Sequence, residues 1–267
     1  MEILNVSAEC FPIAKVGGLA DVVGALPKYH QKNGVVSKVI MPFYQNDFTN
    51  SQSFNTDYSG HLKLGKLHYD FEVLTLKKPL EFPVYLVSIP GLFDRSKVYS
   101  YKDDVERFLA FQLVVLDWMM HLENKPTIVH AHDHHTGFIP FLMSHAFAYE
   151  SLKEIPTVFT IHNAQYQGQF GYDKLRYFPE FDLKKMGIID WDGAINPLAT
   201  AIKCSWRVTT VSPGYLNELK LSANGLEELI NQESGKFEGI LNGIDTEIWN
   251  PATDKLLVKN YSNKASK

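Results

Sequence analysis

The chain has 267 residues, of which 45% are hydrophobic and 21% charged, so it is an ordinary globular sequence that can bury a large core. Its net charge of −4 gives no reason to expect nucleic acid or an anionic membrane as a partner. Cys10 and Cys204 are far apart, which favours two unbridged thiols in a reducing compartment. Because the sequence shows neither a leader pattern nor an apolar run that could span a bilayer, we expect a cytoplasmic protein.

Short apolar runs rich in β-forming residues alternate with helical patterns along the chain. They predict strands at residues 3–7, 38–41, 83–89, 127–131, 157–161 and 207–211, and helices at 19–33, 103–121, 137–149, 196–204 and 213–221. Between about residue 54 and residue 89, apolar and polar residues alternate, which indicates an antiparallel β insertion. The predicted fold class is therefore α/β, a doubly wound and mostly parallel sheet with an antiparallel β insertion.

A loop with one lysine and two glycines lies between the first predicted strand and the first predicted helix. It contains Lys15, Gly17 and Gly18 and is followed by Asp21. Loop amides, the positive end of the helix dipole and a lysine can together bind a phosphate. The glycines are equally consistent with a tight turn that needs only backbone freedom. The spacing is neither that of the dinucleotide-binding motif nor that of Walker A, so both interpretations stay open.

Polar residues follow four of the predicted strands. Segments 9–21, 130–135, 162–163 and 212–214 each come at or just after the end of a strand. Ligands of open parallel sheets bind at the carboxyl ends of the strands. We therefore expect these four segments to form one site.

The second of these segments is unusually rich in histidine. Around Asp133 it carries His130, His132, His134 and His135. Imidazole and carboxylate suit zinc or iron, but the order departs from the H-x-H-x-D-H run of metallo-β-lactamase-like hydrolases. A cluster that hydrogen-bonds sugar hydroxyls and caps the next helix, with Asp133 as acceptor, is favoured over a metallohydrolase. No Ser or Cys stands in a G-x-S-x-G elbow, which argues against covalent hydrolase chemistry.

Residues 15–22 closely resemble the K-T-G-G-L-A-D-V signature of bacterial glycogen synthases and plant starch synthases. Residues 129–137 are similar to the V-H-A-H-D-W-H-A-G segment of that family, and residues 160–163, 209–213 and 242–251 fit it in the same order. The resemblance covers essentially the whole chain. Val16 stands where the family has threonine, and His134 stands where it has tryptophan.

This resemblance implies the N-terminal, Rossmann-like half of a two-domain GT-B glycosyltransferase. The family transfers glucose, with retention, from a nucleotide sugar (ADP-glucose in bacteria) to the non-reducing 4-hydroxyl of an α-1,4-glucan, and needs no catalytic metal or other cofactor. The expected partners are ADP-glucose and glycogen or a maltooligosaccharide, with UDP-glucose left open as the donor. The catalytic domain is expected over residues 1–250. Residues 251–267 are expected to be a cut linker to a nucleotide-binding C-terminal domain that the chain lacks.

Carried over by residue, the resemblance implies three kinds of site residue. The catalytic ones are Glu9, Asp133 and His162, the donor-binding ones are Lys15, Gly17, Gly18, His162, Asn163 and Asn242, and the acceptor-binding ones are Asp21 and Asp133. Cleavage of a glycosyl–phosphate bond leaves negative charge on the diphosphate, which cations and oriented amides stabilise. Unlike most glycosidases, such an enzyme needs no pair of carboxylates acting as acid and nucleophile.

Alone, the chain is expected to be inactive as a synthase. The alternative that we keep open is a non-catalytic module that binds glucan or a partner protein.

Overall fold

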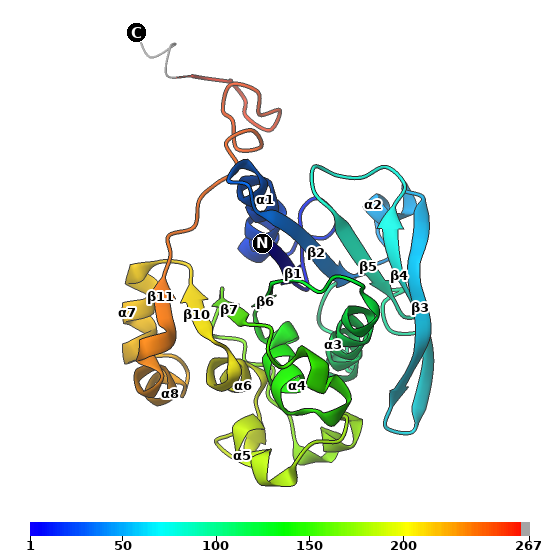
Figure 1. The fold of residues 1–267 in the computed structure, drawn as a ribbon. Helices are drawn as coiled ribbons and strands as arrows, with labels where there is room; N and C mark the ends of the chain where they lie inside the picture. Colours follow the sequence, from blue (N-terminus) through cyan, green and yellow to red (C-terminus); the bar gives the residue numbers. More distant parts are fainter. Residues whose placement is uncertain (263–267) are drawn as a thin grey trace.

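The computed structural model describes residues 1–262, and at its centre is a nine-stranded sheet (Figure 1). The strand order is β11-β10-β7-β6-β1-β2-β5-β4-β3, and the seven strands from β11 to β5 run parallel. The strands of this sheet are β1 (Glu2–Val6), β2 (Val36–Pro42), β3 (Phe54–Leu64), β4 (Leu67–Leu76), β5 (Val84–Ser88), β6 (Ile128–His132), β7 (Thr157–Ile161), β10 (Arg207–Thr210) and β11 (Phe237–Gly239). The predicted mostly parallel α/β sheet is confirmed.

Eight α-helices connect or flank these strands in the described part of the chain. They are α1 (Gly18–Lys32), α2 (Asp47–Asn50), α3 (Asp104–His121), α4 (Ile139–His145), α5 (Met186–Ile189), α6 (Pro197–Cys204), α7 (Pro213–Leu221) and α8 (Glu227–Gln232). A separate two-stranded ribbon consists of β8 (Asp190–Trp191) and β9 (Ala194–Ile195). Helix α1 packs on β2, whereas α3, α4, α6 and α8 pack in succession on one another.

The topology of the sheet indicates where a ligand would bind. From β1 it winds through β2 to β5, then returns to the other side of β1 and winds through β6, β7 and β10 to β11. The order therefore reverses between β1 and β6. In open α/β sheets, the crevice outside the carboxyl ends of the strands at such a point is the usual ligand site.

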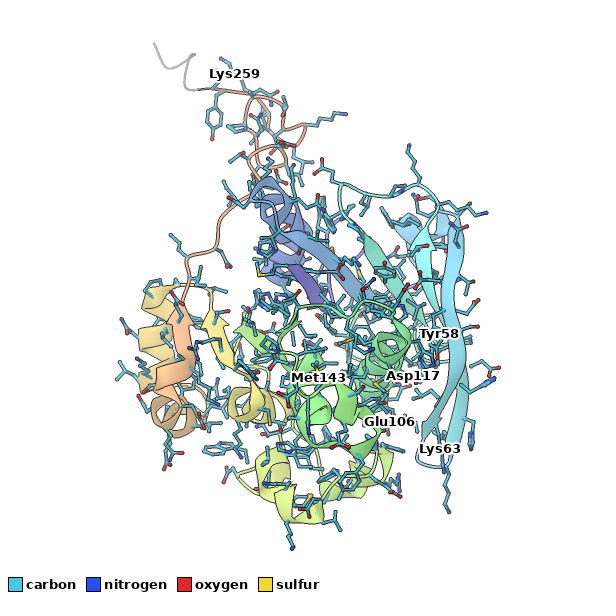
Figure 2. All side chains as sticks on the ribbon, viewed as in Figure 1. Tyr58, Lys63, Glu106, Asp117, Met143 and Lys259 are labelled. Carbon is cyan, nitrogen blue, oxygen red and sulfur yellow. The ribbon has the colours of Figure 1, made fainter. Side chains whose placement is uncertain are left out.

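The predicted antiparallel insertion is the long hairpin of β3 and β4, and β4 pairs antiparallel with β5. The hairpin lies over α3, where the Tyr58 hydroxyl donates to Asp117 (3.1 Å) (Figure 2). Trp118 of α3, which is buried, donates from its indole to Asp57 (2.8 Å). Most of α3 is buried, since the sheet, the hairpin and α4 surround it. The insertion thus completes the core beside the site.

The helix predicted over residues 137–149 is wrong in its extent. Helix α4 ends at His145, because Ala146 is extended (φ −79°, ψ 128°) and forms an isolated β-bridge with Phe181. The chain then continues as a 3₁₀ segment, Phe147–Leu152. A contact with a distant segment thus overrides the local helical pattern.

Beyond β11 the described chain runs without helix or strand and returns to α1. There Lys28 pairs with Asp245 (3.4 Å) and Glu247 (2.6 Å). Part of the linker predicted over residues 251–267, residues 263–267, lies outside the described residues, and the domain division at residue 250 stays a prediction. Both cysteines are free thiols, as predicted. No helix within residues 1–262 has the length and apolar character needed to cross a membrane.

Candidate active site

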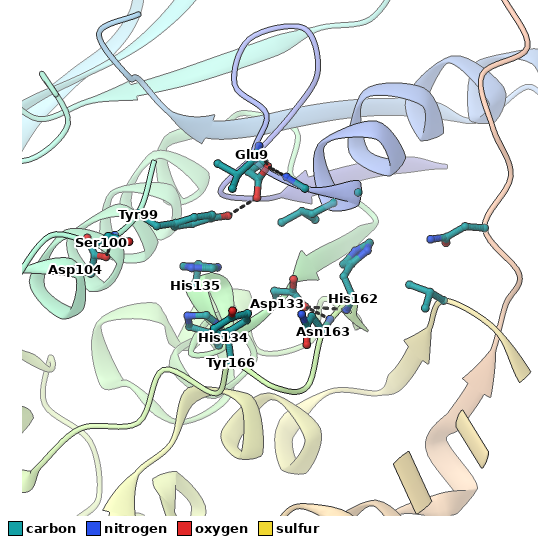
Figure 3. Close-up of a pocket in the computed structure, with 16 residues that line it drawn as sticks. Glu9, Tyr99, Ser100, Asp104, Asp133, His134, His135, His162, Asn163 and Tyr166 are labelled. Carbon is teal, nitrogen blue, oxygen red and sulfur yellow. Dashed lines mark hydrogen bonds between the residues drawn. The ribbon is translucent and has the colours of Figure 1, made fainter. Parts of the chain in front are cut away.

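A cavity of about 750 Å³ opens at the carboxyl ends of β1, β6, β7 and β10 (Figure 3). Its volume lies within the usual range of small-molecule sites. Among the predicted site residues, those that line it are Glu9, Gly17, Gly18, Asp133, His162, Asn163 and Asn242. The segments after β1, β6 and β7 therefore converge on one cavity, as the sequence predicts, whereas the predicted segment 212–214 does not line it and the end of β10 contributes only Val211.

Glu9 anchors the loop that follows β1. Its side chain is buried, and Oε2 accepts hydrogen bonds from the backbone amides of Val16 and Gly17. Its other oxygen, Oε1, accepts one from the Tyr99 hydroxyl (2.7 Å). Burial and the nearby Glu9 charge raise the pKa of Tyr99, which keeps that hydroxyl protonated as a donor. Because both carboxylate oxygens are engaged, Glu9 holds the loop in place.

Gly17 and Gly18 leave open space at the start of α1. Gly17 has an extended backbone (φ −137°, ψ −165°), which any residue can adopt. A Cβ atom added at either glycine would meet no atom within 4 Å. The Glu9 carboxylate accepts from the amide of Gly17, the N-cap residue, but no side chain in residues 1–262 accepts from the next amides of α1, those of Gly18 to Ala20, so this first turn of a 15-residue helix faces the space. The geometry favours the interpretation of the loop as an anion cradle over the tight turn, because backbone freedom does not require these glycines.

Lys15 and Asp21 do not line the large cavity. Their side chains are paired (2.7 Å) and each is about one-third exposed, at 39% and 31%. The Lys15 ammonium lies 5.4 Å from the centroid of the Trp249 ring. Lys15 lines a neighbouring hollow of about 460 Å³, and Asp21 lines another of about 210 Å³. Asp21 shares its hollow with Gly18 and Asn242, which also line the large cavity, whereas the hollow of Lys15 contains none of the other predicted residues.

Asp133 stands immediately after β6, in a backbone conformation that is rare for a residue with a side chain (φ 55°, ψ 175°). It is 8% exposed, and its Oδ1 accepts hydrogen bonds from the amides of His162 (2.7 Å) and Asn163 (3.4 Å). Burial raises the pKa of Asp133 to about 7, although the two amides oppose the shift. Near neutral pH this carboxyl can either accept or donate a hydrogen bond.

Three of the histidines near the site, His130, His132 and His162, are neutral groups that bond to one another or to threonine. Nδ1 of His132 lies 3.1 Å from Nε2 of His162, and Nε2 of His130 lies 2.6 Å from the Thr160 hydroxyl. Burial lowers the pKa of His162 to about 4 and that of His130 to about 3. Nowhere in residues 1–262 do three or more His, Cys, Asp or Glu side chains form a group that could hold a metal ion.

The sequence prediction missed the wall that comes from the segment between β5 and α3. Tyr99, Ser100 and Asp104 line the cavity there, and the Tyr99 ring stacks on His135 with centroids 4.4 Å apart. Tyr166, which is 61% exposed, lines the same cavity. Ligands of parallel sheets bind at the carboxyl ends of the strands, and we call this the strand-end rule. Since β5 is parallel to β2, the rule also applies to β5.

A doubly wound sheet with a cavity at its switch point, a helix N-terminus on one side and neutral polar groups on the other defines a Rossmann-like ligand-binding domain. The chain belongs to the starch synthase catalytic domain family, whose family model matches residues 2–232. The resemblance seen in the sequence is thereby confirmed.

Curated relatives and a solved structure agree with this assignment. A glycogen synthase of Flavobacterium johnsoniae is 53% identical over 263 residues, and one of Streptococcus agalactiae serotype III is 38% identical over 274 residues. In both cases the match covers 98% of this chain and 56% of the relative.

The catalytic domain of starch synthase IV from Arabidopsis thaliana, solved with ADP and acarbose bound, superposes with a TM-score of 0.87 at 32% identity. That match covers 98% of this chain and 56% of the solved chain. The Rossmann-like GT-B fold class is confirmed. The chain spans about half the length of the relatives it matches.

Proposed function

We propose that this chain carries the sugar-holding part of a cytoplasmic glycogen synthase active site. The reaction is retaining transfer of glucose from ADP-glucose to the non-reducing 4-hydroxyl of an α-1,4-glucan. The observation that carries the proposal is the single cavity in which the open start of α1 meets Asp133 and His162. The similar Arabidopsis starch synthase, solved with ADP and acarbose, supports a nucleotide-sugar donor and a glucan acceptor.

On the α1 side, the amides of the helix start and Lys15 stabilise the charge that develops on the diphosphate leaving group. Gly17 and Gly18 let the phosphate approach the backbone, since a side chain at either position would occupy the open space. Lys15 reaches the phosphate by exchanging its exposed partner Asp21 for the ligand. An exposed ion pair of this kind costs little to break.

On the β6–β7 side, His162 hydrogen-bonds the transferred glucose, and Asn163 and Asn242 lie on the same cavity wall. Asp133 orients sugar hydroxyls on the donor and acceptor side. Glu9 acts indirectly, by fixing the loop, because its carboxylate is already engaged by three donors. Because Glu9 is fully engaged, the two carboxylates do not form a free acid–nucleophile pair, which agrees with a retaining reaction that needs none.

The other wall of the site is proposed to come from a nucleotide-binding domain outside this chain. The chain matches only 56% of each relative, and the large cavity opens to solvent. Without the second wall, water enters and the contacts to the nucleotide are absent. The 267-residue chain alone is therefore expected to have no appreciable synthase activity.

The test is to join this chain to the part of the Flavobacterium johnsoniae glycogen synthase that it does not match, and to measure incorporation of labelled glucose into glycogen. The fusion is expected to elongate glycogen from ADP-glucose, and the unfused chain is expected not to. A parallel assay with UDP-glucose shows which of the two nucleotide sugars the fusion uses as donor.

Elongation by the unfused chain would overturn the need for a second domain. A folded fusion that is inactive with both donors would overturn the synthase proposal. Calorimetric binding of maltooligosaccharide without ADP-glucose would then favour the glucan-binding module.

A further inference from the structure

We infer that Asn5, which lies on β1 behind the cavity, determines which ring nitrogen of His162 faces the substrate, and that it does so through His132. Asn5 and His132 are both fully buried. Neither residue lines the cavity, so both are positioning residues. The inference deepens the proposed function, on which it rests for the contact between His162 and the sugar.

A backbone carbonyl fixes the orientation of the Asn5 amide. Nδ2 of Asn5 donates to the Lys38 carbonyl (3.0 Å) and to the Ser37 hydroxyl (2.9 Å). A carbonyl oxygen can only accept, so the group that faces Lys38 must be the NH₂ group. A flipped amide would place two oxygens against each other. Oδ1 of Asn5 therefore points to the other side, where Nε2 of His132 lies at 3.5 Å.

The fixed amide in turn determines the tautomer of His132. Because Oδ1 of Asn5 can only accept, Nε2 of His132 must carry a proton. Burial among other histidines holds the pKa of His132 well below its usual value, so the ring is neutral and Nδ1 carries only a lone pair. Nδ1 is the atom 3.1 Å from Nε2 of His162.

The tautomer of His162 follows by the same reasoning. Its Nε2 must donate to His132, so Nδ1 is left as an acceptor. Nδ1 makes no hydrogen bond within residues 1–262, and it is not among the buried atoms there that lack a partner. Since His162 lines the cavity, Nδ1 is open to it. The site thus presents an acceptor that fits a donating hydroxyl of a hexose.

The chain of bonds continues away from the site with the same polarity. The Ser37 hydroxyl accepts from Asn5 and also lies 3.0 Å from Nδ1 of His30 on α1; because a hydroxyl can accept two hydrogen bonds, the inferred polarity ends at Ser37. Every donor along the path from His162 to Ser37 points away from the cavity. His130 lies beside His132 with ring centroids 4.1 Å apart, but its Nε2 bonds to Thr160 instead.

Nitrogen NMR of the 267-residue chain labelled with ring-¹⁵N histidine tests the inference without substrate. In the unmodified protein, both His132 and His162 are expected to be protonated at Nε2 and unprotonated at Nδ1 at pH 7. Observation of His162 protonated at Nδ1 would overturn the inference outright, with no variant needed.

Two variants locate the cause. Asn5→Leu removes the acceptor, so the His162 signals are expected to move to a mixture of both tautomers. Thr209→Val is the matched control, because it breaks the hydrogen bond to Thr160 (2.7 Å) on the His130 side and leaves the Asn5 path intact. It is expected to keep the single tautomer. A His162 tautomer that is unchanged in folded Asn5→Leu would refute the role of Asn5.

In the fusion enzyme described above, Asn5→Leu is expected to lower kcat/KM for the nucleotide sugar about tenfold, the value of one neutral hydrogen bond. An inactive unmodified fusion would refute the proposed function but would leave the NMR result standing. An active fusion in which Asn5→Leu and Thr209→Val behave alike would contradict the inference.

Discussion

On the β6–β7 side of the cavity, the polar groups are buried and bonded to one another, whereas on the β1–α1 side the charged pair is exposed. Asp133 and His162 belong to the first region and are fixed by backbone amides and a neighbouring ring. Lys15 and Asp21 belong to the second, where they pair with each other and the Lys15 ammonium lies near the Trp249 ring. The difference indicates that the fold preorganises the groups that hold the sugar. It leaves the charged groups free to rearrange around the phosphate.

A substitution of Glu9 is the strongest test of this contrast. Glu9 lies on the β1–α1 side, but unlike Lys15 and Asp21 it is buried and holds the loop in place. Glu9→Ala leaves the Val16 and Gly17 amides and the Tyr99 hydroxyl without their acceptor. We expect the free energy of unfolding to fall by about 3 kcal/mol, since three hydrogen bonds are lost and each contributes about 1 kcal/mol. Urea denaturation measures the loss. Glu238→Ala, at an exposed position, is the control, and equal stability of the two variants would show that Glu9 is no anchor.

Asp133→Asn is expected to act in the opposite direction. The asparagine Oδ1 can still accept from the His162 and Asn163 amides, and the cost of burying a charge disappears. At pH 8 we expect the variant to be about 2–3 kcal/mol more stable than the unmodified chain, while the fusion enzyme loses activity.

The pH dependence of that difference follows from the pKa of Asp133. It is about 7 in the folded chain, whereas the ordinary value of an aspartate, which applies to the unfolded chain, is 3.8. Between these values the folded state binds more protons, so the stability of the unmodified chain falls as pH rises through this window. The advantage of the variant should therefore grow from pH 4 to pH 7 and vanish below. A variant that is less stable than the unmodified chain at pH 8 would contradict the account.

The buried histidines predict sensitivity to acid. The pKa of His162 is lowered from 6.5 to about 4, so the unfolded state binds more protons between these values and stability is lost as pH falls through them. His162→Gln should reduce the loss of stability between pH 7 and pH 5 by about 1–2 kcal/mol. His68→Gln, on the exposed hairpin, is the control and should change nothing. Parallel stability curves for all three proteins would argue against a neutral, buried His162.

Lys15→Ala is expected to have the smallest effect on stability and a large effect on function. Its ion pair with Asp21 is exposed, so stability should change by less than about 0.5 kcal/mol. In the fusion enzyme, activity should fall on the order of a hundredfold, because a cation at the leaving group is lost. Lys63→Ala, an exposed lysine of β3, should leave both unchanged. A Lys15→Ala fusion with full activity would remove Lys15 from the site.

Local patterns could predict the fold where a strand is buried and apolar, as for residues 157–161, which form β7 as expected. They failed at Ala146, because its conformation depends on a bridge to Phe181 far along the chain. The strand-end rule located Asp133 and His162, and it could have located Tyr99 had it been applied to β5.

Two features of the site lay beyond any sequence pattern. The pairing of Lys15 with Asp21 depends on side-chain conformation. The path from Asn5 through His132 depends on the register of β1 against β6 and β2. Polar residues within apolar strands carry no local signal of the partners that they meet across a sheet.

The central claim is that this cavity is where the nucleotide sugar binds. Titration of the ¹⁵N-labelled chain with ADP-glucose, followed through backbone amide shifts, tests it most directly. The account predicts shifts concentrated at Gly17, Gly18 and His162, on both sides of the cavity. Shifts confined to other surfaces such as the β3–β4 hairpin, with the cavity amides unmoved, would contradict it.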